Sequence, residues 1–340
     1  MLKARYEKLT LHFKRPSGTS RGVLTEKISY LIRICDSLNP SVCGIGECSL
    51  IPGLSPDDSP DYESVLESAC DDIERLQGSF HQQLQSYPSI RFGIETALLD
   101  LKRGGVHHFF DSSFTSGQSG IPINGLIWMG NSTDMMEQTE AKLLSGFTCL
   151  KMKIGAIAIE QELSVLRSLR SRFPVSKLQL RVDANGAFRS EDAMPILKQL
   201  ADLQVHSIEQ PLAAGQWQAM ADICLHSPIP VALDEELIGL YNPLKRLEML
   251  STIRPQYIIL KPSLLGGFQA SQEWIKLAES LSIGWWITSA LESNVGLNAI
   301  AQWTSSFAVQ IPQGLGTGAL YTNNVPSKLC IRGERLWYDV

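Results

Sequence analysis

The stretch that decides the fold is Thr148-Cys149-Leu150-Lys151-Met152-Lys153, an apolar run that ends in a lysine and carries a second one. Similar apolar runs end at Asp183, Glu209, Asp234 and Lys261, so ionisable residues follow one another at intervals of 30, 26, 25 and 27 residues. One strand and one helix of an eight-fold βα barrel take about 30 residues, so each interval has the length of one βα unit. Strand ends of such a barrel meet at one mouth, which would bring these residues together.

Further segments complete the count of strands. Residues 121–128 are expected to form the first barrel strand, 283–289 the seventh and 308–315 the eighth. Helical spacing of apolar residues lies between strands, as at residues 159–169 and 191–203. Strands that alternate with helices of this length require parallel pairing and right-handed crossovers. The sequence therefore predicts an α/β fold with a (β/α)8-type barrel, a modified TIM barrel.

The first hundred or so residues have a different pattern. Alternation of apolar and polar residues at 27–35 indicates a strand, and helical spacing follows further along. Residues 111–120 are rich in Ser and Gly and are interpreted as a linker. We expect an α+β capping domain at residues 1–115, with the tail 318–340 returning to it, and a barrel catalytic domain at residues 116–317.

Composition narrows the class of protein. Of 340 residues, 44% are hydrophobic and 19% are charged, which is typical of a globular protein with a large core. A net charge of −5 gives no reason to expect nucleic acid as a partner, and no apolar run is long enough to cross a membrane. The seven cysteines form no Cys-x-x-Cys pair or even framework, and no apolar signal segment is present at the N-terminus. We therefore expect a protein of the reducing cytoplasm, and the sequence carries no signal of oligomeric state.

Strand parity selects the side chains that face the barrel interior. Residues two apart on a strand share a face, so Lys151 and Lys153 both point inward, as do Asp183 and Asn185. With Glu209 inward, His206 points outward, and the other histidines fall outside the strand ends. Lysine is therefore the predicted proton-transfer group.

Three of the strand-end residues are acidic and come from consecutive strands. Asp183, Glu209 and Asp234 offer hard oxygen donors, which suit Mg²⁺, whereas the lack of nearby Cys or His ligands argues against zinc. Without a cation the packed carboxylates would repel one another, and their pKa values would rise. A single acid at a strand end often only meets solvent, but three in register favour a metal site.

Two lysines on one inward face are costly unless they are paired or used. A nearby cation would lower the pKa of Lys153 and make it a base near neutrality, while Lys261 could face the opposite side of a bound substrate. Two bases on opposite faces of one carbon suit racemisation, whereas one base with a second lysine as an electrostatic clamp suits elimination. A barrel that only binds a carboxylate ligand would not need such a base.

Weaker signals are interpreted conservatively. Gly44-x-Gly46 lacks the third glycine of a dinucleotide site and is interpreted as a turn, and Gly266-Gly267 as a loop that leads into a helix. Trp285-Trp286 is expected in the barrel core.

The strand-end residues belong to five short motifs: Lys151-x-Lys153, Asp183-Ala184-Asn185, Ile208-Glu209-Gln210-Pro211, Asp234-Glu235 and Lys261-Pro262. Through these motifs the chain resembles the muconate-lactonising branch of the enolase superfamily over nearly its whole length. Within that branch the sequence is most similar to the o-succinylbenzoate synthases, through residues 50–55, 289–296 and 314–317. Dipeptide epimerases of the branch carry Asp-x-Asp where this chain reads Gly314-Leu315-Gly316.

The resemblance implies roles at matching positions. Asp183, Glu209 and Asp234 would hold Mg²⁺, as acids do in this superfamily. Lys153 would remove the proton α to the substrate carboxylate and return it to the departing hydroxyl, and Lys261 would lie over the opposite face of the ring.

Further residues are assigned in the same way. Glu235 would pair with Lys261, and the residues implied in substrate binding are Lys151, Asn185, Ser289 and Leu315. Loops at 16–21 and 48–56 would close over the mouth.

The implied reaction is the Mg²⁺-dependent syn dehydration of 2-succinyl-6-hydroxy-2,4-cyclohexadiene-1-carboxylate to o-succinylbenzoate in menaquinone biosynthesis, through an enediolate. The substrate partner is thus a small carboxylate. The alternatives within the superfamily are an N-acylamino-acid racemase, a dipeptide epimerase and a muconate-type cycloisomerase.

Overall fold

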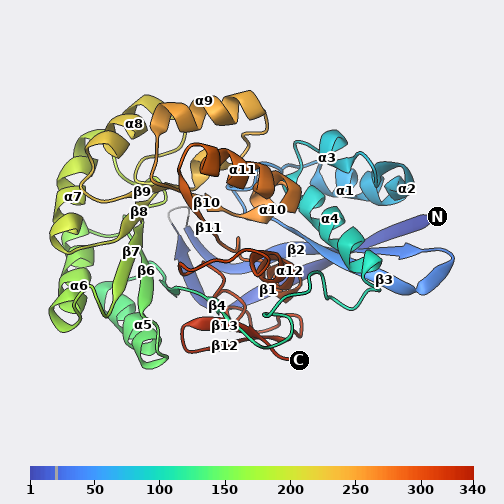
Figure 1. The fold of residues 1–340 in the computed structure, drawn as a ribbon, viewed down its shortest axis with the longest axis horizontal. Coiled ribbons are helices and arrows are strands. Elements are labelled where there is room, and N and C mark those ends of the chain that lie inside the picture. Colours follow the sequence, from blue (N-terminus) through green and yellow to red (C-terminus); the bar gives the residue numbers. More distant parts are fainter. Residues whose placement is uncertain (20–21) are drawn as a thin grey trace.

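The computed structural model describes residues 1–19 and 22–340, and Figure 1 shows a capping part beside a barrel. The cap begins with an antiparallel sheet in the order β1-β2-β3, formed by β1 (Leu2–Thr19), β2 (Gly22–Asp36) and β3 (Asn39–Ser49). Four helices follow, namely α1 (Tyr62–Asp71), α2 (Ile73–Leu76), α3 (Phe80–Gln83) and α4 (Pro88–Lys102). Alternate residues of β2 are buried against these helices, which is the strand period predicted for residues 27–35.

Gly44 and Gly46 lie within strand β3, so their interpretation as a turn was wrong. Helix α4 crosses β3 so closely that a Cβ on Gly46 would lie 1.9 Å from the carbonyl oxygen of Gly93. A Cβ on Gly44 would lie 1.9 Å from the carbonyl oxygen of Ala97. The glycines are therefore required by helix-to-strand packing, a contact between segments distant in sequence that no local pattern encodes.

The barrel contains seven parallel strands that pair in sequence order from β5 to β11. They are β5 (Gly125–Ile127), β6 (Cys149–Lys153), β7 (Gln179–Asp183), β8 (Ser207–Glu209), β9 (Val231–Leu233), β10 (Tyr257–Leu260) and β11 (Gly284–Ile287). Most of their apolar residues are buried, as expected for parallel strands covered on one face by helices and on the other by the barrel interior, while Leu126, Tyr257 and Trp285 are half-buried. The α/β barrel predicted from the spacing of strand ends is thus confirmed.

Helices follow the strands and lie outside them, and Figure 1 shows α5 to α9 as an arc around the strands. Their bounds are α5 (Ser132–Leu144), α6 (Ile159–Arg172), α7 (Ser190–Asp202), α8 (Trp217–His226), α9 (Pro243–Ile253), α10 (Pro262–Leu265), α11 (Phe268–Ser280) and α12 (Asn294–Thr304), with a 3₁₀ turn η1 (Glu235–Leu237). Asparagine side chains cap α5 and α9, since Asn131 accepts from Asp134 N and Asn242 accepts from Leu244 N.

The first and eighth barrel strands differ from the prediction. Within the expected strand 121–128, Gly125–Ile127 pairs with β6 and Ile123 makes a single parallel bridge to Gln313, whereas β4 (Ile121–Pro122) pairs with the C-terminal β13 (Arg335–Tyr338). The expected eighth strand at 308–315 is reduced to parallel bridges from Gln313 to Ile123 and from Gly314 to Thr288. Pro312 has no N–H to donate, so pairing begins only after it.

The tail contacts both parts of the molecule. Lys14 N donates to Leu320 O and Thr322 N donates to His12 O, so this segment runs along β1 of the cap. Beyond it β12 (Leu329–Arg332) and β13 form a hairpin that pairs with β4 at the start of the barrel. The tail therefore contributes to the cap and to the barrel in turn, and the division into domains at residues 1–115, 116–317 and 318–340 remains a proposal.

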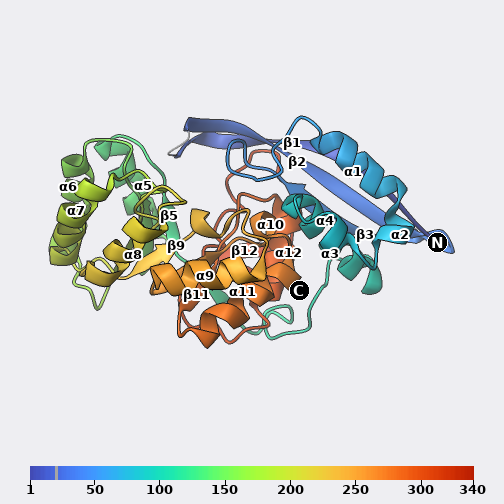
Figure 2. The same ribbon diagram turned by 90° about the horizontal axis from the view of Figure 1, so that it is seen from above.

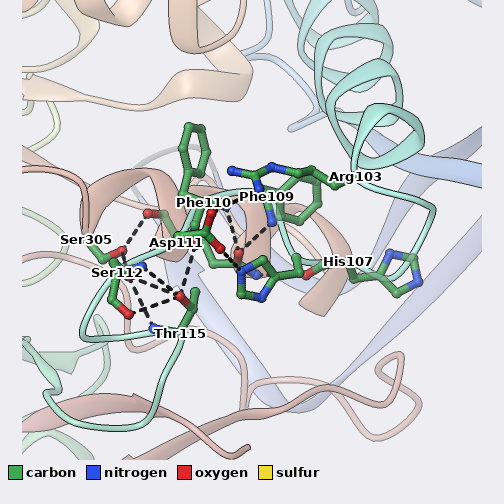
Figure 3. Close-up of polar contacts among 10 residues, drawn as sticks. Arg103, His107, Phe109, Phe110, Asp111, Ser112, Thr115 and Ser305 are labelled. Atoms are coloured by element: carbon green, nitrogen blue, oxygen red, sulfur yellow. Dashed lines mark hydrogen bonds and ion pairs between the residues drawn. The ribbon is translucent and has the colours of Figure 1, made fainter.

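The segment predicted as a linker is bonded to the barrel helix α12 (Figure 3). Ser112 Oγ lies 2.8 Å from Ser305 Oγ, and Phe109 N donates to Gln302 Oε1 at 2.7 Å. Arg103 at the end of α4 donates to Asp111 Oδ2 at 3.0 Å. These bonds link the end of α4 and the connecting segment to α12.

Cys35 and Cys43 form a disulfide, which the expectation of a reducing cytoplasm did not include. They are direct cross-strand neighbours near the turn between β2 and β3, so register rather than sequence spacing brings them together. In the described part of the chain the other five cysteines are free, and four of them are buried. A cytoplasmic location remains a proposal. No helix among the described residues is both long and apolar enough to cross a membrane.

Candidate active site

The carboxyl ends of neighbouring strands bring the predicted residues to one end of the barrel. Lys153 is the Cα partner of Asp183 in the β6–β7 ladder, and Asp183 is the partner of Glu209 in the β7–β8 ladder. Asp234 directly follows β9, and Lys261 directly follows β10. Continuous parallel register thus places these five side chains at the same mouth.

The lysines and acids form a chain of buried ion pairs. Lys151 Nζ lies 2.9 Å from Asp183 Oδ2 and 2.5 Å from Glu209 Oε2. Lys153 Nζ lies 3.1 Å from Asp183 Oδ2, and Lys261 Nζ contacts Asp234 Oδ2. These lysine side chains are at most 13% exposed, and the acids at most 2%. The mouth therefore holds three ammonium groups against three carboxylates in a setting almost free of bulk water.

The carboxylates differ in how well they are compensated. Burial opposes ionisation of Asp183, but the charges of Lys151 and Lys153 outweigh it and hold its pKa below the ordinary value. Burial and the charge of Asp183 raise the pKa of Glu209 to about 8, and burial likewise raises the pKa of Asp234. Glu209 Oε1 is buried and has no hydrogen-bond partner among the described residues. An unpartnered oxygen among three hard donors fits a divalent cation.

The positions of the lysines also bear on this cation. In the described part of the chain no three His, Cys, Asp or Glu side chains stand in a geometry that could hold a metal ion. Instead, the ammonium of Lys151 is shared between Asp183 and Glu209, and that of Lys261 contacts Asp234. Ligation by Asp183, Glu209 and Asp234 therefore remains a proposal, and it requires these ammonium groups to shift.

Asn185 connects Lys153 to Glu235. Lys153 Nζ donates to Asn185 Oδ1 at 2.7 Å, and Asn185 Nδ2 donates to Glu235 Oε1 at 3.0 Å. Glu235 was expected to pair with Lys261, but Lys261 makes its ion pair with Asp234. Burial lowers the pKa of Lys261, and the charges of Asp234, Glu209 and Glu235 overcome this and raise it. Glu235 thus acts on Lys261 through its charge while it holds Asn185.

A cavity of about 210 Å³ opens beside these residues. Its walls come from the strand ends, from the cap and from the last barrel turns: Lys151, Lys153, Asn185, Lys261, Gly22, Val23, Leu24, Ile51, Pro52, Leu54, Asn124, Leu126, Trp128, Thr288, Ser289, Ala290, Leu291, Gly314, Gly316 and Thr317. Figure 2 shows β1 and β2 extending from the cap towards the barrel. Ile51, Pro52 and Leu54 of the cap segment 48–56 line the cavity, and the predicted closure of this segment over the mouth remains a proposal. In the predicted loop 16–21, residues 16–19 belong to strand β1, and residues 20 and 21 lie outside the described residues.

Two predicted substrate-binding residues are placed unfavourably. Leu315 is fully buried in the barrel core, and only its neighbours Gly314 and Gly316 line the cavity, because parity turns the middle residue away. Ser289 lines the cavity, but its hydroxyl donates to Glu292 Oε2 at 2.6 Å. The hydroxyl proton of Ser289 is therefore already used within the protein.

Other wall residues were missed from the sequence. The indole ring of Trp128 lies 6.0 Å from Lys153 Nζ, within cation–π range. Two buried polar atoms of cavity-lining residues, Asn124 Oδ1 and Thr288 Oγ1, have no hydrogen-bond partner in the described part of the chain. Parity could have found part of this group, since Asn124, Leu126 and Trp128 are spaced two apart and all line the cavity.

Known proteins with similar sequences and structures identify the family of this chain. Residues 134–322 match the family model described as enolase C-terminal domain-like. An o-succinylbenzoate synthase from Desulfotalea psychrophila is 48% identical over 97% of this chain and 97% of its own length. The crystal structure of MenC from that organism superposes with a TM-score of 0.85 at 44% identity and covers 99% of both chains. A dipeptide epimerase from Enterococcus faecalis, solved with Mg and a dipeptide, has a TM-score of 0.84 at 17% identity over 100% of this chain and 97% of its own, a likeness of fold alone.

Proposed function

This chain belongs to the enolase superfamily, and we propose that it is a hydro-lyase that converts 2-succinyl-6-hydroxy-2,4-cyclohexadiene-1-carboxylate to o-succinylbenzoate and water. The observation that carries the proposal is that Lys153 and Lys261 line one cavity, each held by an acid at a strand end. Near full-length similarity to an o-succinylbenzoate synthase supports this reaction within the superfamily. The product's place is then in menaquinone biosynthesis.

Lys153 is the proposed base. Its ammonium is oriented by Asp183 and Asn185, and as a neutral amine it would take the proton from the carbon next to the ring carboxylate. The same nitrogen then gives that proton to the departing hydroxyl, so hydrogen and hydroxyl leave from one face and form water. One residue can serve both steps because the two leaving groups lie on neighbouring carbons.

Lys261 is the proposed electrostatic partner. It lines the same cavity and is fixed by Asp234, so its ammonium can stabilise the negative charge that develops on the substrate as the proton leaves. Dehydration does not require it to transfer a proton.

Asp183, Glu209 and Asp234 are the proposed ligands of a divalent ion, for which we propose Mg²⁺, as in other members of this superfamily. When bound, the ion would supply Lewis-acid stabilisation of the charge on the substrate carboxylate. With Lys153 as a neutral base, the three acids, the ammonium groups of Lys151 and Lys261 and a divalent ion sum to one positive charge, which suits an anionic substrate.

N-Acylamino-acid racemisation is the second candidate, because it would also use two lysines that line one cavity. Dipeptide epimerisation is less well supported, since none of the described cavity-lining residues is acidic and Gly314 and Gly316 offer no anchor for an ammonium group.

The test is to incubate the protein with Mg²⁺ and the cyclohexadiene acid and to follow aromatisation by absorbance. We expect rapid formation of o-succinylbenzoate. Absence of turnover, with fast α-deuterium exchange on N-acylamino acids in the same preparation, would replace the lyase by the racemase. We also propose a cytoplasmic location and a small-molecule carboxylate as the only substrate partner.

A further inference from the structure

One wall of the cavity is a turn in an unfavourable backbone conformation. Leu291, which lines the cavity, has φ 62°, in the left-handed region that side chains other than glycine rarely adopt. Its N–H donates to Ser289 Oγ at 3.2 Å, and its carbonyl accepts from Tyr321 Oη at 2.7 Å. Such strain persists only where surrounding contacts hold it in place, so the groups that hold this turn control the wall.

Glu292 holds the turn from the barrel side. Its side chain is fully buried, and it accepts hydrogen bonds from Ser289 Oγ at 2.6 Å and from Ala290 N at 2.8 Å. Ser263 Oγ, from helix α10 after Lys261, donates to its other oxygen. Glu292 thus connects the turn to the segment that directly follows Lys261.

Glu47 holds the same turn from the cap. This strand-β3 carboxylate is fully buried and accepts from Ser293 N at 2.8 Å, from Ser293 Oγ and from Gly296 N at 2.9 Å. Ser293 is the N-cap residue of α12, so an anion from the cap occupies the amino end of a barrel helix. A Cβ on Gly296 would lie 2.8 Å from Glu292 Cγ and 3.0 Å from Glu47 Oε2, so the two glutamates meet there.

A buried cation accompanies the two glutamates. Lys27 of β2 is 2% exposed and donates to Ser29 Oγ at 2.8 Å and to Ser49 Oγ at 2.7 Å. The negative charges that act on it are those of Glu47 and Glu292. Three buried charges therefore sit where the cap meets the turn. Apolar contacts would join the cap to the barrel without the cost of desolvating charges, whereas hydrogen bonds to charged groups also fix the orientation of the cap.

We infer that Glu47 is a positioning residue. It couples the position of the cap on the barrel to the conformation of the turn at residues 289–293, and this turn sets the position of Leu291 in the substrate cavity. The inference rests on the proposed lyase function for its kinetic consequence. Among the described residues Glu47 does not line the cavity, so it acts on the cavity through Ser293 and the turn. Its loss should weaken the fit of the non-reacting part of the substrate more than the proton transfer at Lys153.

The experiment compares Glu47→Gln with Asp100→Asn. Asp100 is also a fully buried carboxylate of the cap, and it accepts from Ile45 N at 3.0 Å and His107 N at 2.7 Å, away from the turn. For Glu47→Gln we expect KM for the cyclohexadiene acid and Kd for o-succinylbenzoate to rise about tenfold, with kcat within about threefold. Asp100→Asn should lower Tm with KM and Kd within about twofold of wild type.

Hydrogen exchange gives a readout that needs no substrate. Amides of residues 289–296 should exchange faster in Glu47→Gln than in wild type, and at the wild-type rate in Asp100→Asn. Equal protection of this segment in both variants, with unchanged KM and Kd, would overturn the inference. A wild-type protein without turnover would instead refute the proposed function, and the exchange comparison would still decide whether Glu47 positions the turn.

Two further variants test whether Glu47 acts through the turn: Leu291→Gly tests the coupling, and Ser293→Ala replaces Glu47→Gln if that variant does not fold. Leu291→Gly removes the strained side chain, so adding Glu47→Gln in that background should change KM by less than about twofold. Independent, multiplying effects of the two changes on KM would contradict the coupling. If Glu47→Gln alone does not fold, Ser293→Ala, which removes one of its three hydrogen bonds, should produce the same rise in KM to a smaller extent.

Discussion

Glu95 should make the stability of this protein fall as the pH rises from 5 to 8. It lies on α4 of the cap and accepts hydrogen bonds from Phe268 N and Gln269 N at the start of barrel helix α11. Burial raises its pKa from 4.5 to about 7, and the hydrogen bonds and the charge of Arg91 only partly oppose this. His81, 3.9 Å away, has its own pKa lowered to about 4, mainly by burial, and stays neutral throughout this range.

The direction of this pH dependence follows because the pKa of Glu95 is higher in the folded protein than in the unfolded chain. Below pH 4.5 the carboxyl is protonated in both folded and unfolded protein and contributes nothing. Between pH 4.5 and 7 the unfolded chain loses the proton first, so the free energy of unfolding decreases as the pH rises. Above pH 7 both states are ionised and the loss stays constant. With about 1.4 kcal/mol for each pKa unit, a rise from 4.5 to about 7 amounts to about 3.5 kcal/mol in full, of which about 2.5 kcal/mol is lost between pH 5 and 8.

The assay is urea unfolding of wild type and Glu95→Gln at pH 5, 6, 7 and 8. Glutamine keeps one oxygen for the helix start and cannot ionise, so the difference in unfolding free energy should shift by about 2.5 kcal/mol in favour of the variant between pH 5 and 8. Other titrating groups cancel in the difference, including Asp57, whose pKa burial raises to about 6. Parallel pH profiles for the two proteins would refute the reasoning.

The other predictions concern the site and the packing of the cap. Lys153→Ala should lower kcat for dehydration about 10²- to 10⁴-fold with an unchanged circular dichroism spectrum, and wild-type activity of this variant would exclude Lys153 as the base. Lys261→Ala should abolish any racemisation and retain some dehydration. Chelation with EDTA should stop turnover and added Mg²⁺ should restore it, and activity that survives chelation would contradict a metal requirement. Gly46→Ala should destabilise the protein by about 3 kcal/mol in urea unfolding because its Cβ meets Gly93 O, while Gly78→Ala, with open space around it, should have almost no effect.

The barrel could be predicted from the sequence because its signal is periodic and local. Each apolar run had the length of a strand, and parity placed Lys151 and Lys153 on one face before any contact was known. Parallel register then puts Asp183 opposite Lys153 and Glu209 opposite Asp183. Residue roles do not follow from that geometry, and the ligand and base assignments remain proposals.

Features that depend on contacts between distant segments could not be predicted. The need for glycine at position 46 follows from helix α4, which crosses the strand there, and the pairing of Cys35 with Cys43 follows from the register of β2 and β3. The expected eighth strand failed for a similar reason, since its closing bridges are made only at Gln313 and Gly314, beyond a proline. In each case the deciding partner lies in another element, where sequence spacing carries no information.

The cap and the barrel are joined by the same physical device at two neighbouring points. Glu95 accepts N–H groups at the start of α11, and Glu47 accepts those at the start of α12. The amino ends of these helices lie on the side of the barrel where the strands end, which is also where Lys261 and Leu291 face the cavity. A helix start offers several directed N–H groups and a favourable dipole to an anion, so each glutamate fixes orientation as well as distance. Because both contacts lie at the catalytic end, a small displacement of the cap would change the shape of the substrate cavity directly. Contacts at the opposite end of the barrel would stabilise the molecule without controlling the site.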